Sequence, residues 1–198
     1  MICVHAMGGR NSGYVDSVDG KIMGQSVVIK ELIPHIDATY RTIASRGGRA
    51  IQGFSKGGQG ALLLAFRYPE MFSSVAGYGA GLANGTELKK ELPAVFKEMH
   101  NDDIQQFDDT SAWAWVHKNA EKIQQTLPIQ IILGSKDPHL QRNRHMHAVL
   151  DELKIPCEYE ELEGVGHDPR KVCELRGLKG FQFHASHFEQ ANTTATKP

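Results

Sequence analysis

The stretch RAIQGFSKGGQGALLLAF, residues 49–66, places four glycines and one serine between a short apolar segment and a longer one. Residues 49–54 predict a strand, and the small-residue and leucine-rich part, about 57–67, predicts a helix. The connection GFSKG, residues 53–57, matches the pattern G-x-S-x-G. At a strand-to-helix junction this pattern is typical of a sharp turn that lifts a serine hydroxyl above a sheet. We therefore predict that Ser55 is a nucleophile.

Glycines are expected around this turn because side-chain bulk would clash there. We expect Gly53 and Gly57 at the most crowded positions, whereas Gly58 and Gly60 let the helix approach the sheet. Two phosphate-binding patterns do not fit, since a Walker-type loop needs a Gly-Lys-Ser/Thr ending and a dinucleotide fingerprint needs G-x-G-x-x-G. The remaining alternative is a glycine-rich turn with an incidental serine. Residues elsewhere in the chain are needed to choose between this alternative and a nucleophilic serine.

Short apolar segments rich in β-branched residues alternate along the chain with longer segments of helical period. This alternation predicts an α/β fold with a mostly parallel sheet and helices on both faces. The predicted strands cover residues 2–7, 49–54, 73–81, 129–137 and, as an edge strand, 157–164. The predicted helices cover 26–45 with a kink at Pro34, 57–67, a charged segment around 87–99, a segment near Trp113 and Trp115, a segment from Met146 to Leu153, and 169–178.

The domain organisation follows from the length and from a change in this pattern. The 198 residues suit one domain, which we place at 1–187. The periodic signal weakens over 83–127, so we expect an insertion that lies over the active site. The polar tail, 188–198, is predicted to be disordered.

The charge balance argues against binding of polyanions, because 22 Lys and Arg face 23 Asp and Glu. No stretch approaches the roughly 20 apolar residues of a membrane span. We therefore expect neither a nucleic-acid nor a membrane partner. The start MICVHAMGGR is unlike a signal peptide, so the chain as it stands suggests the cytoplasm, or secretion if a signal peptide preceded it. Cys3, Cys157 and Cys173 are expected to be reduced.

A serine nucleophile needs a base, and the base needs a group that orients it. In folds with this turn the order along the chain is Ser, acid, His. Asp137 follows a predicted strand, and His167 follows the last one in a glycine-flanked loop. Alternatively, Asp137 is an ordinary helix cap and His167 a solvent-facing loop residue. Asp168 is a weaker candidate for the acid, because it is adjacent to His167.

We expect the remaining histidines to have structural and not catalytic roles. His139, His145 and His147 cluster in sequence, but the last two face different ways on a helix and no H-E-x-x-H pattern is present. His184 and His187 could share one helical face. We expect no metal site and no cofactor.

Four segments together resemble the putative-esterase family of α/β-hydrolases, which contains feruloyl esterases, acetyl xylan esterases and S-formylglutathione hydrolases. They are ELIPHIDATYRT (31–42), GRAIQGFSKGGQGALLLAFRYPEMF (48–72), GSKDPHLQRN (134–143) and GVGHD (164–168). The resemblance extends over about residues 3–187. It implies Ser55 as nucleophile, His167 as general base and acid, and Asp137 as the acid that orients it.

The resemblance departs from the family in two places. Lys56 stands where relatives usually have methionine; its backbone N–H can still serve the oxyanion hole. Relatives also carry an earlier strand and a His-Gly loop that provides the second oxyanion donor. Only about 40 residues separate Gly9 from the next strand, too few for the missing elements. We therefore expect an N-terminally short family member, whose exposed strand edge favours a homo-oligomer.

These observations predict a serine carboxylesterase that acts on a small-molecule or polysaccharide-linked ester. The resemblance suggests feruloyl or acetyl esters of plant polysaccharides, or similar short-chain or aryl esters. Trp113 or Trp115 would stack on a sugar or a phenolic group, unless both simply pack in the core. The alternatives are an S-formylglutathione-type thioester hydrolase and an inactive hydrolase-like interaction module.

Overall fold

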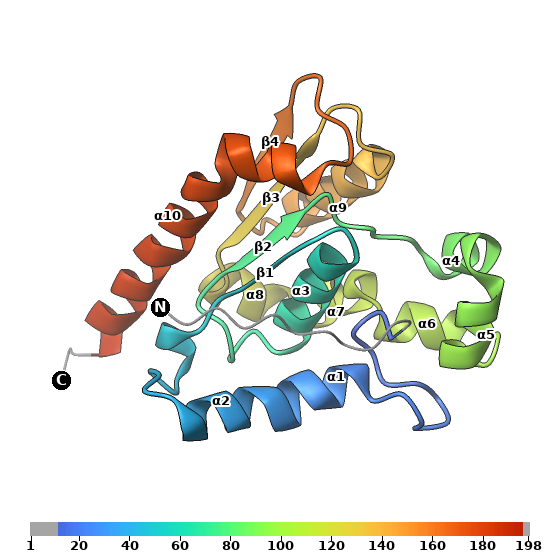
Figure 1. The fold of residues 1–198 in the computed structure, drawn as a ribbon, viewed down its shortest axis with the longest axis horizontal. Coiled ribbons are helices and arrows are strands. Elements are labelled where there is room, and N and C mark those ends of the chain that lie inside the picture. Colours follow the sequence, from blue (N-terminus) through green and yellow to red (C-terminus); the bar gives the residue numbers. More distant parts are fainter. Residues whose placement is uncertain (1–11, 196–198) are drawn as a thin grey trace.

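A parallel sheet of four strands forms the centre of the fold (Figure 1). The computed structural model describes residues 12–195, with side chains up to residue 188. The strand order is β1-β2-β3-β4, with β1 at Ile51–Phe54, β2 at Val75–Tyr78, β3 at Ile129–Gly134 and β4 at Cys157–Leu162. The parallel sheet and the edge position of β4 confirm the sequence prediction. The predicted strand at 2–7 lies outside the described residues.

The central strand β3 explains why the sheet is covered on both faces. All six of its residues are buried, as expected for a continuous apolar strand of a parallel sheet. Ile129, Ile131 and Leu133 belong to one core cluster, whereas Ile132 belongs to another. Because side chains alternate along a strand, these clusters lie on opposite faces of the sheet.

Helices from different parts of the chain cover the two faces. On one face α3 (Lys56–Arg67) and α9 (Leu140–Glu152) contribute residues to the larger cluster. On the other face Val172 of α10 (Pro169–Ala195) packs with Ile132. Figure 1 shows α10, in red, on the side of the sheet opposite α3. The predicted coverage of both faces is confirmed.

Helix α10 is longer than the sequence predicts. It continues to Ala195 instead of ending near 178, so the structure is helical over 188–195, where the sequence predicts disorder. Phe183 and His184 are both 6% exposed, and His184 contacts Ser74, the residue before β2. Burial against the sheet stabilises a helix beyond the point where its local sequence pattern weakens.

The first helical segment is broken up around Pro34. The chain forms α1 (Gly24–Ser26), a π-helical segment (Val27–Leu32) and α2 (Ile33–Thr39). Proline lacks the N–H that an α-helix needs and crowds the preceding turn, and here that turn is widened into the π form. The segment ends at Thr39 and not at 45, because Tyr40 is extended. A short 3₁₀ helix (Arg46–Gly48) leads to β1.

Five short helices connect β2 to β3. They are α4 (Gly85–Glu91), α5 (Pro93–His100), α6 (Ile104–Thr110), α7 (Ala112–Lys118) and α8 (Ala120–Thr126). The charged helix predicted around 87–99 is split at Leu92, because Pro93 starts a new helix. Buried residues of α7 join those of α3 in the larger core cluster. Within residues 12–195, no helix is both long and apolar enough to cross a membrane.

Candidate active site

Ser55 occupies a strained turn between β1 and α3. Its backbone has φ 56° and ψ −119°, a left-handed conformation that costs a non-glycine residue about 1–3 kcal/mol. A Cβ on Gly53 would overlap the backbone of Gly57, and one on Gly58 would come within 3.0 Å of the Gly53 oxygen. A Cβ on Gly57 would meet no atom within 4 Å, so the crowding predicted for Gly57 is wrong. Within the turn the crowded positions are Gly53 and Gly58. Gly60, on α3, is crowded by the ring of Tyr14 and not by the sheet.

The structure brings together Ser55, His167 and Asp137, which are far apart in the sequence. Nε2 of His167 lies 2.9 Å from Oγ of Ser55, and Nδ1 of His167 lies 2.7 Å from Oδ2 of Asp137. A carboxylate only accepts hydrogen bonds, so Nδ1 carries the proton and Nε2 is left to accept from the serine hydroxyl. The side chain of Asp137 is 1% exposed and that of His167 27%. The imidazole therefore connects a buried carboxylate to a hydroxyl.

Two glycines let the loops that carry these side chains approach one another. A Cβ on Gly134, at the end of β3, would overlap the carbonyl of Val165. The N–H of Lys136 donates to the same carbonyl at 2.8 Å, which joins the Asp137 loop to the His167 loop. A Cβ on Gly79 would lie 2.8 Å from Oδ2 of Asp137. The contact between the carboxylate of Asp137 and the imidazole of His167 thus requires glycine at positions 79 and 134.

Lys56 lies directly after Ser55, as the first residue of α3. The N–H groups of a first helical turn have no partner within the helix and attract negative charge. The backbone N–H of Lys56 therefore belongs to the first turn of α3, directly after the serine, and its side chain is exposed. The segment considered for a second donor, 4–9, lies outside the described residues.

The two tryptophans occupy different places. Trp113 lines an open cavity of about 480 Å³, together with residues of α4 and α9 such as Glu87 and Arg142. Its ring lies 4.9 Å from that of His145. Trp115 instead packs against Arg67, whose guanidinium carbon lies 4.8 Å from the centroid of the Trp115 ring. Arg67 is the last residue of α3, at the end opposite Ser55. A helix of twelve residues is about 18 Å long, so Trp115 does not reach Ser55.

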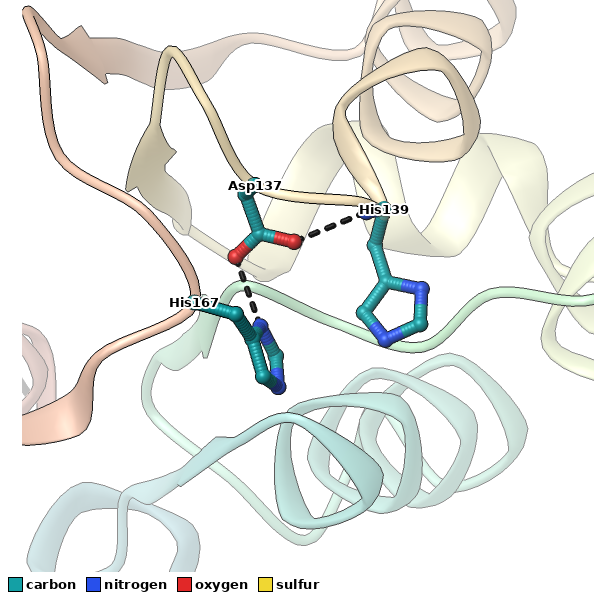
Figure 2. A group of neighbouring side chains, drawn as sticks. All are labelled: Asp137, His139 and His167. Carbon is teal, nitrogen blue, oxygen red and sulfur yellow. Dashed lines mark hydrogen bonds and ion pairs between the residues drawn. The ribbon is translucent and has the colours of Figure 1, made fainter.

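His139 belongs to this site, although the sequence favoured a structural interpretation for it. Its ring meets that of His167 edge-on, with centroids 4.9 Å apart and an angle of 85° (Figure 2). Its backbone N–H donates to Oδ1 of Asp137 at 2.8 Å. Burial lowers the pKa of His139, and this effect exceeds the opposing effect of the nearby Asp137 carboxylate. The signal in the sequence was its position two residues after the candidate acid.

Asp137, His139 and His167 each offer a ligand atom within 4.8 Å of the others, which is the composition of a metal site. Asp137 and His167 already use their donor and acceptor atoms. Both oxygens of Asp137 accept N–H bonds, and Nε2 of His167 faces the serine hydroxyl. These contacts fit proton transfer better than metal binding.

The other histidines lie elsewhere. His147 stacks on Tyr159 of β4 with ring centroids 4.3 Å apart. On α10, Nδ1 of His184 lies 2.8 Å from Oγ of Ser74 in the core.

Comparison with known proteins points to one family. The sequence model of the family described as "Putative esterase" matches residues 10–168. An endo-1,4-beta-xylanase/feruloyl esterase of Xylanibacter ruminicola is 41% identical over 68 residues, which are 34% of this chain and 9% of that protein.

Two solved structures have the same fold. A ferulic acid esterase superposes with a TM-score of 0.70 at 22% identity, covering 89% of this chain and 64% of its own. An S-formylglutathione hydrolase from Agrobacterium tumefaciens superposes with a TM-score of 0.75 at 22% identity, covering 89% and 63%. The fold is that of the α/β-hydrolases. The chain spans less than two thirds of the length of each of these three relatives.

Proposed function

Because this chain belongs to the putative-esterase family, we propose that it is a serine carboxylesterase. Its catalytic residues in this proposal are Ser55, His167 and Asp137. The observation that carries the proposal is the continuous hydrogen-bond path from Oγ of Ser55 through the imidazole to the carboxylate, at 2.9 and 2.7 Å. The left-handed backbone of Ser55 supports it, because strain is retained at functional positions.

In the proposed reaction, Oγ of Ser55 attacks the ester carbonyl carbon while Nε2 of His167 takes its proton. Asp137 stabilises the imidazolium, and the N–H of Lys56 donates to the developing oxyanion. The same Nε2–H then protonates the leaving oxygen, and the alcohol departs from an acyl-Ser55 intermediate. A water molecule, deprotonated by His167, attacks this acyl group and releases the carboxylic acid and the free serine.

For the substrate we propose feruloyl or acetyl esters of plant polysaccharides, or related short-chain or aryl esters. The relatives named as feruloyl and ferulic acid esterases support this choice. The cavity lined by Trp113, between α4, α7 and α9, offers an aromatic wall to a phenolic or sugar group. In this arrangement the segment 83–127 borders the substrate. The position of Trp115 supports core packing and not substrate contact.

A thioester hydrolase is the second candidate, favoured by the superposition on S-formylglutathione hydrolase. Turnover of S-formylglutathione and of methyl ferulate should be compared on the same preparation. The proposal expects the larger kcat/KM on methyl ferulate, and the reverse order would favour the thioesterase.

The decisive experiment compares wild type with Ser55→Ala on p-nitrophenyl acetate. Removing a serine nucleophile should lower kcat by about 1000-fold or more, because the base then has no hydroxyl to activate. A fluorophosphonate probe, mapped by mass spectrometry, should label Ser55 and no other serine. Equal hydrolysis by both proteins, without labelling, would favour an inactive interaction module.

A further inference from the structure

The backbone of His139 is fixed from several sides. Its N–H donates to Asp137, and its carbonyl accepts from Nδ2 of Asn143 at 2.9 Å. Asn143 is fully buried and also donates to the carbonyl of Ala80 at 2.8 Å. The start of α9 is thereby joined to the loop that follows β2. The imidazole of His139 projects from a rigid support, as catalytic and binding groups require.

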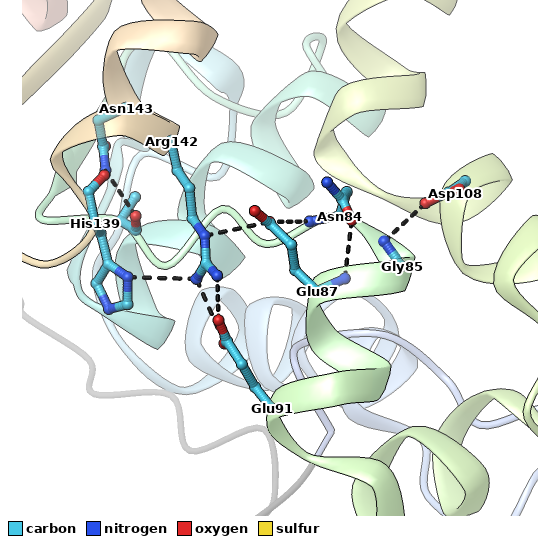
Figure 3. A network of polar contacts seen from close by, with 9 residues as sticks. Asn84, Gly85, Glu87, Glu91, Asp108, His139, Arg142 and Asn143 are labelled. Atoms are coloured by element: carbon cyan, nitrogen blue, oxygen red, sulfur yellow. Dashed lines mark hydrogen bonds and ion pairs between the residues drawn. The ribbon is translucent and has the colours of Figure 1, made fainter.

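On one side of the imidazole, Nδ1 of His139 lies 3.5 Å from Nη1 of Arg142 (Figure 3). Arg142 is held by two carboxylates of α4, with Nε 3.2 Å from Glu87 and Nη2 paired with Glu91. A guanidinium has only donors, so Nδ1 must be the acceptor. A neutral imidazole carries one proton, and burial favours the neutral form by lowering the pKa of His139. The proton of His139 is therefore on Nε2.

The other side of the imidazole lies near Gly81, in the loop that follows β2. Nε2 of His139 lies 3.9 Å from the position that a Cβ on Gly81 would occupy, and Oε1 of Gln59 lies 3.8 Å from the same position. The N–H of Gly81 donates to the carbonyl of Ser55 at 3.2 Å. Among residues 12–188, no side chain or carbonyl accepts a hydrogen bond from Nε2 of His139. In Figure 2 both imidazoles extend away from Asp137 toward the same side.

The two imidazoles thus carry their protons on opposite nitrogens. His167 has its proton on Nδ1 and an accepting Nε2, whereas His139 has an accepting Nδ1 and a proton on Nε2. Nε2 of His167 must accept the proton of Ser55, so it cannot donate a hydrogen bond to the substrate before the serine attacks. His139 supplies the donor that His167 lacks.

We infer that Nε2–H of His139 donates a hydrogen bond to an oxygen on the alcohol half of the ester, an inference that rests on the proposed function. In that reaction His167 protonates the leaving oxygen, so the alcohol half lies beside His167. The ring of His139 is in contact with that of His167 and reaches the same half. The preferred alcohols therefore carry a second oxygen near the ester bond, as polyols and ether alcohols do, and simple alkyl alcohols do not.

The test uses two acetates of nearly equal shape, 2-methoxyethyl acetate and butyl acetate, which differ by one ether oxygen in place of a methylene. Hydrolysis is followed in a pH-stat for wild type, His139→Phe and His139→Gln. The measured quantity is the ratio of the two kcat/KM values. Comparing this ratio between proteins removes the intrinsic difference in reactivity of the two esters.

The ratio should fall about 3- to 10-fold in His139→Phe, which keeps a ring but has no N–H, because a neutral hydrogen bond contributes a factor of this size. It should stay within about twofold of wild type in His139→Gln, whose amide retains a donor. The matched control is His147→Phe on the same helix, stacked on Tyr159 away from the site, which should leave the ratio unchanged. An unchanged ratio in His139→Phe would overturn the inference.

A second measurement does not depend on hydrolysis. Nitrogen-15 NMR of the imidazole groups in Ser55→Ala should show His139 with its proton on Nε2. Arg142→Met removes the group that selects this tautomer, so it should give a mixture and lower the ratio. A proton on Nδ1 in the presence of Arg142 would contradict the inference, and this result can be obtained even if His139→Phe does not fold.

The two proposals fail in different ways. If Ser55→Ala hydrolyses both acetates as fast as wild type, the proposed function is wrong and the inference falls with it. If Ser55→Ala is inactive but the ratio is the same in wild type and His139→Phe, only the inference falls. Labelling by a fluorophosphonate and the thermal unfolding midpoint identify any variant whose site is no longer formed.

Discussion

At the scale of single residues, the site depends on its glycines, which have no Cβ, as much as on its functional side chains. Ser55 holds a left-handed backbone, and the β1–α3 turn closes only because position 53 has no Cβ. Gly79 and Gly134 have the same role for the Asp137 and His167 loops. The structure separates such positions from Gly57, which lies in the same sequence pattern and has space around it.

This difference predicts opposite results for two similar substitutions. Gly53→Ala should destabilise the fold by about 2–4 kcal/mol and remove most esterase activity, because the new methyl group overlaps the backbone of Gly57. Gly57→Ala should change the free energy of unfolding by less than about 1 kcal/mol, since alanine favours a helix and meets no neighbour. Urea unfolding of both variants measures the difference. Equal losses would mean that the turn is not as crowded as the structure shows.

At the scale of elements, α10 is attached to the sheet through a buried histidine. His184 is 6% exposed, and its Nε2 has no hydrogen-bond partner among the described residues. Burial lowers the pKa of His184 to about 4 from the ordinary value of 6.5. The neutral form is therefore part of the folded state, whereas the unfolded chain takes up a proton already near pH 6.5.

The pH dependence of stability follows from this shift. Below pH 6.5 the unfolded state binds a proton that the folded state does not, so the contribution of His184 is complete above pH 6.5 and is lost as the pH falls toward 4. The loss is about 3–4 kcal/mol, because the pKa is lowered from 6.5 to about 4 and a difference of one in pKa corresponds to about 1.4 kcal/mol. Denaturant unfolding of wild type and His184→Gln between pH 4 and 7.5 measures it. The slope should be smaller in the variant, and equal slopes would exclude His184 as the cause.

At the scale of the whole molecule, the described sheet has two edges, β1 and β4. Among the described residues, the outer side of β1 has no paired strand. An unpaired edge favours association with another chain. The homo-oligomer expected from the sequence thus stays a prediction.

Light scattering at micromolar concentration tests this prediction. A dimer or larger assembly is expected, with a molar mass at least twice the 21.9 kDa of the chain. Pairing through the edge further predicts that charged substitutions of the exposed Gln52 on β1 lower the measured mass. A well-behaved monomer in wild type would contradict the expectation.

Elements with strong local patterns were predictable from the sequence. β1, α3 and β3 appear close to their expected positions, because their periodicity and turn residues determine local structure. Helix ends were less predictable. The end of α10 depends on Phe183 and His184 packing against the sheet, and the break at Leu92 on the proline after it.

The three residues of the candidate site were predictable from the sequence, since the turn around Ser55 is a local steric pattern and the order Ser, Asp, His can be read along the chain. Their distances, the position of His139 beside His167 and the separation of Trp115 from Ser55 became known from the folded chain. A local pattern depends on residues that are only a few positions apart. Contacts between side chains 30 or 112 positions apart depend on how the sheet and its loops pack together.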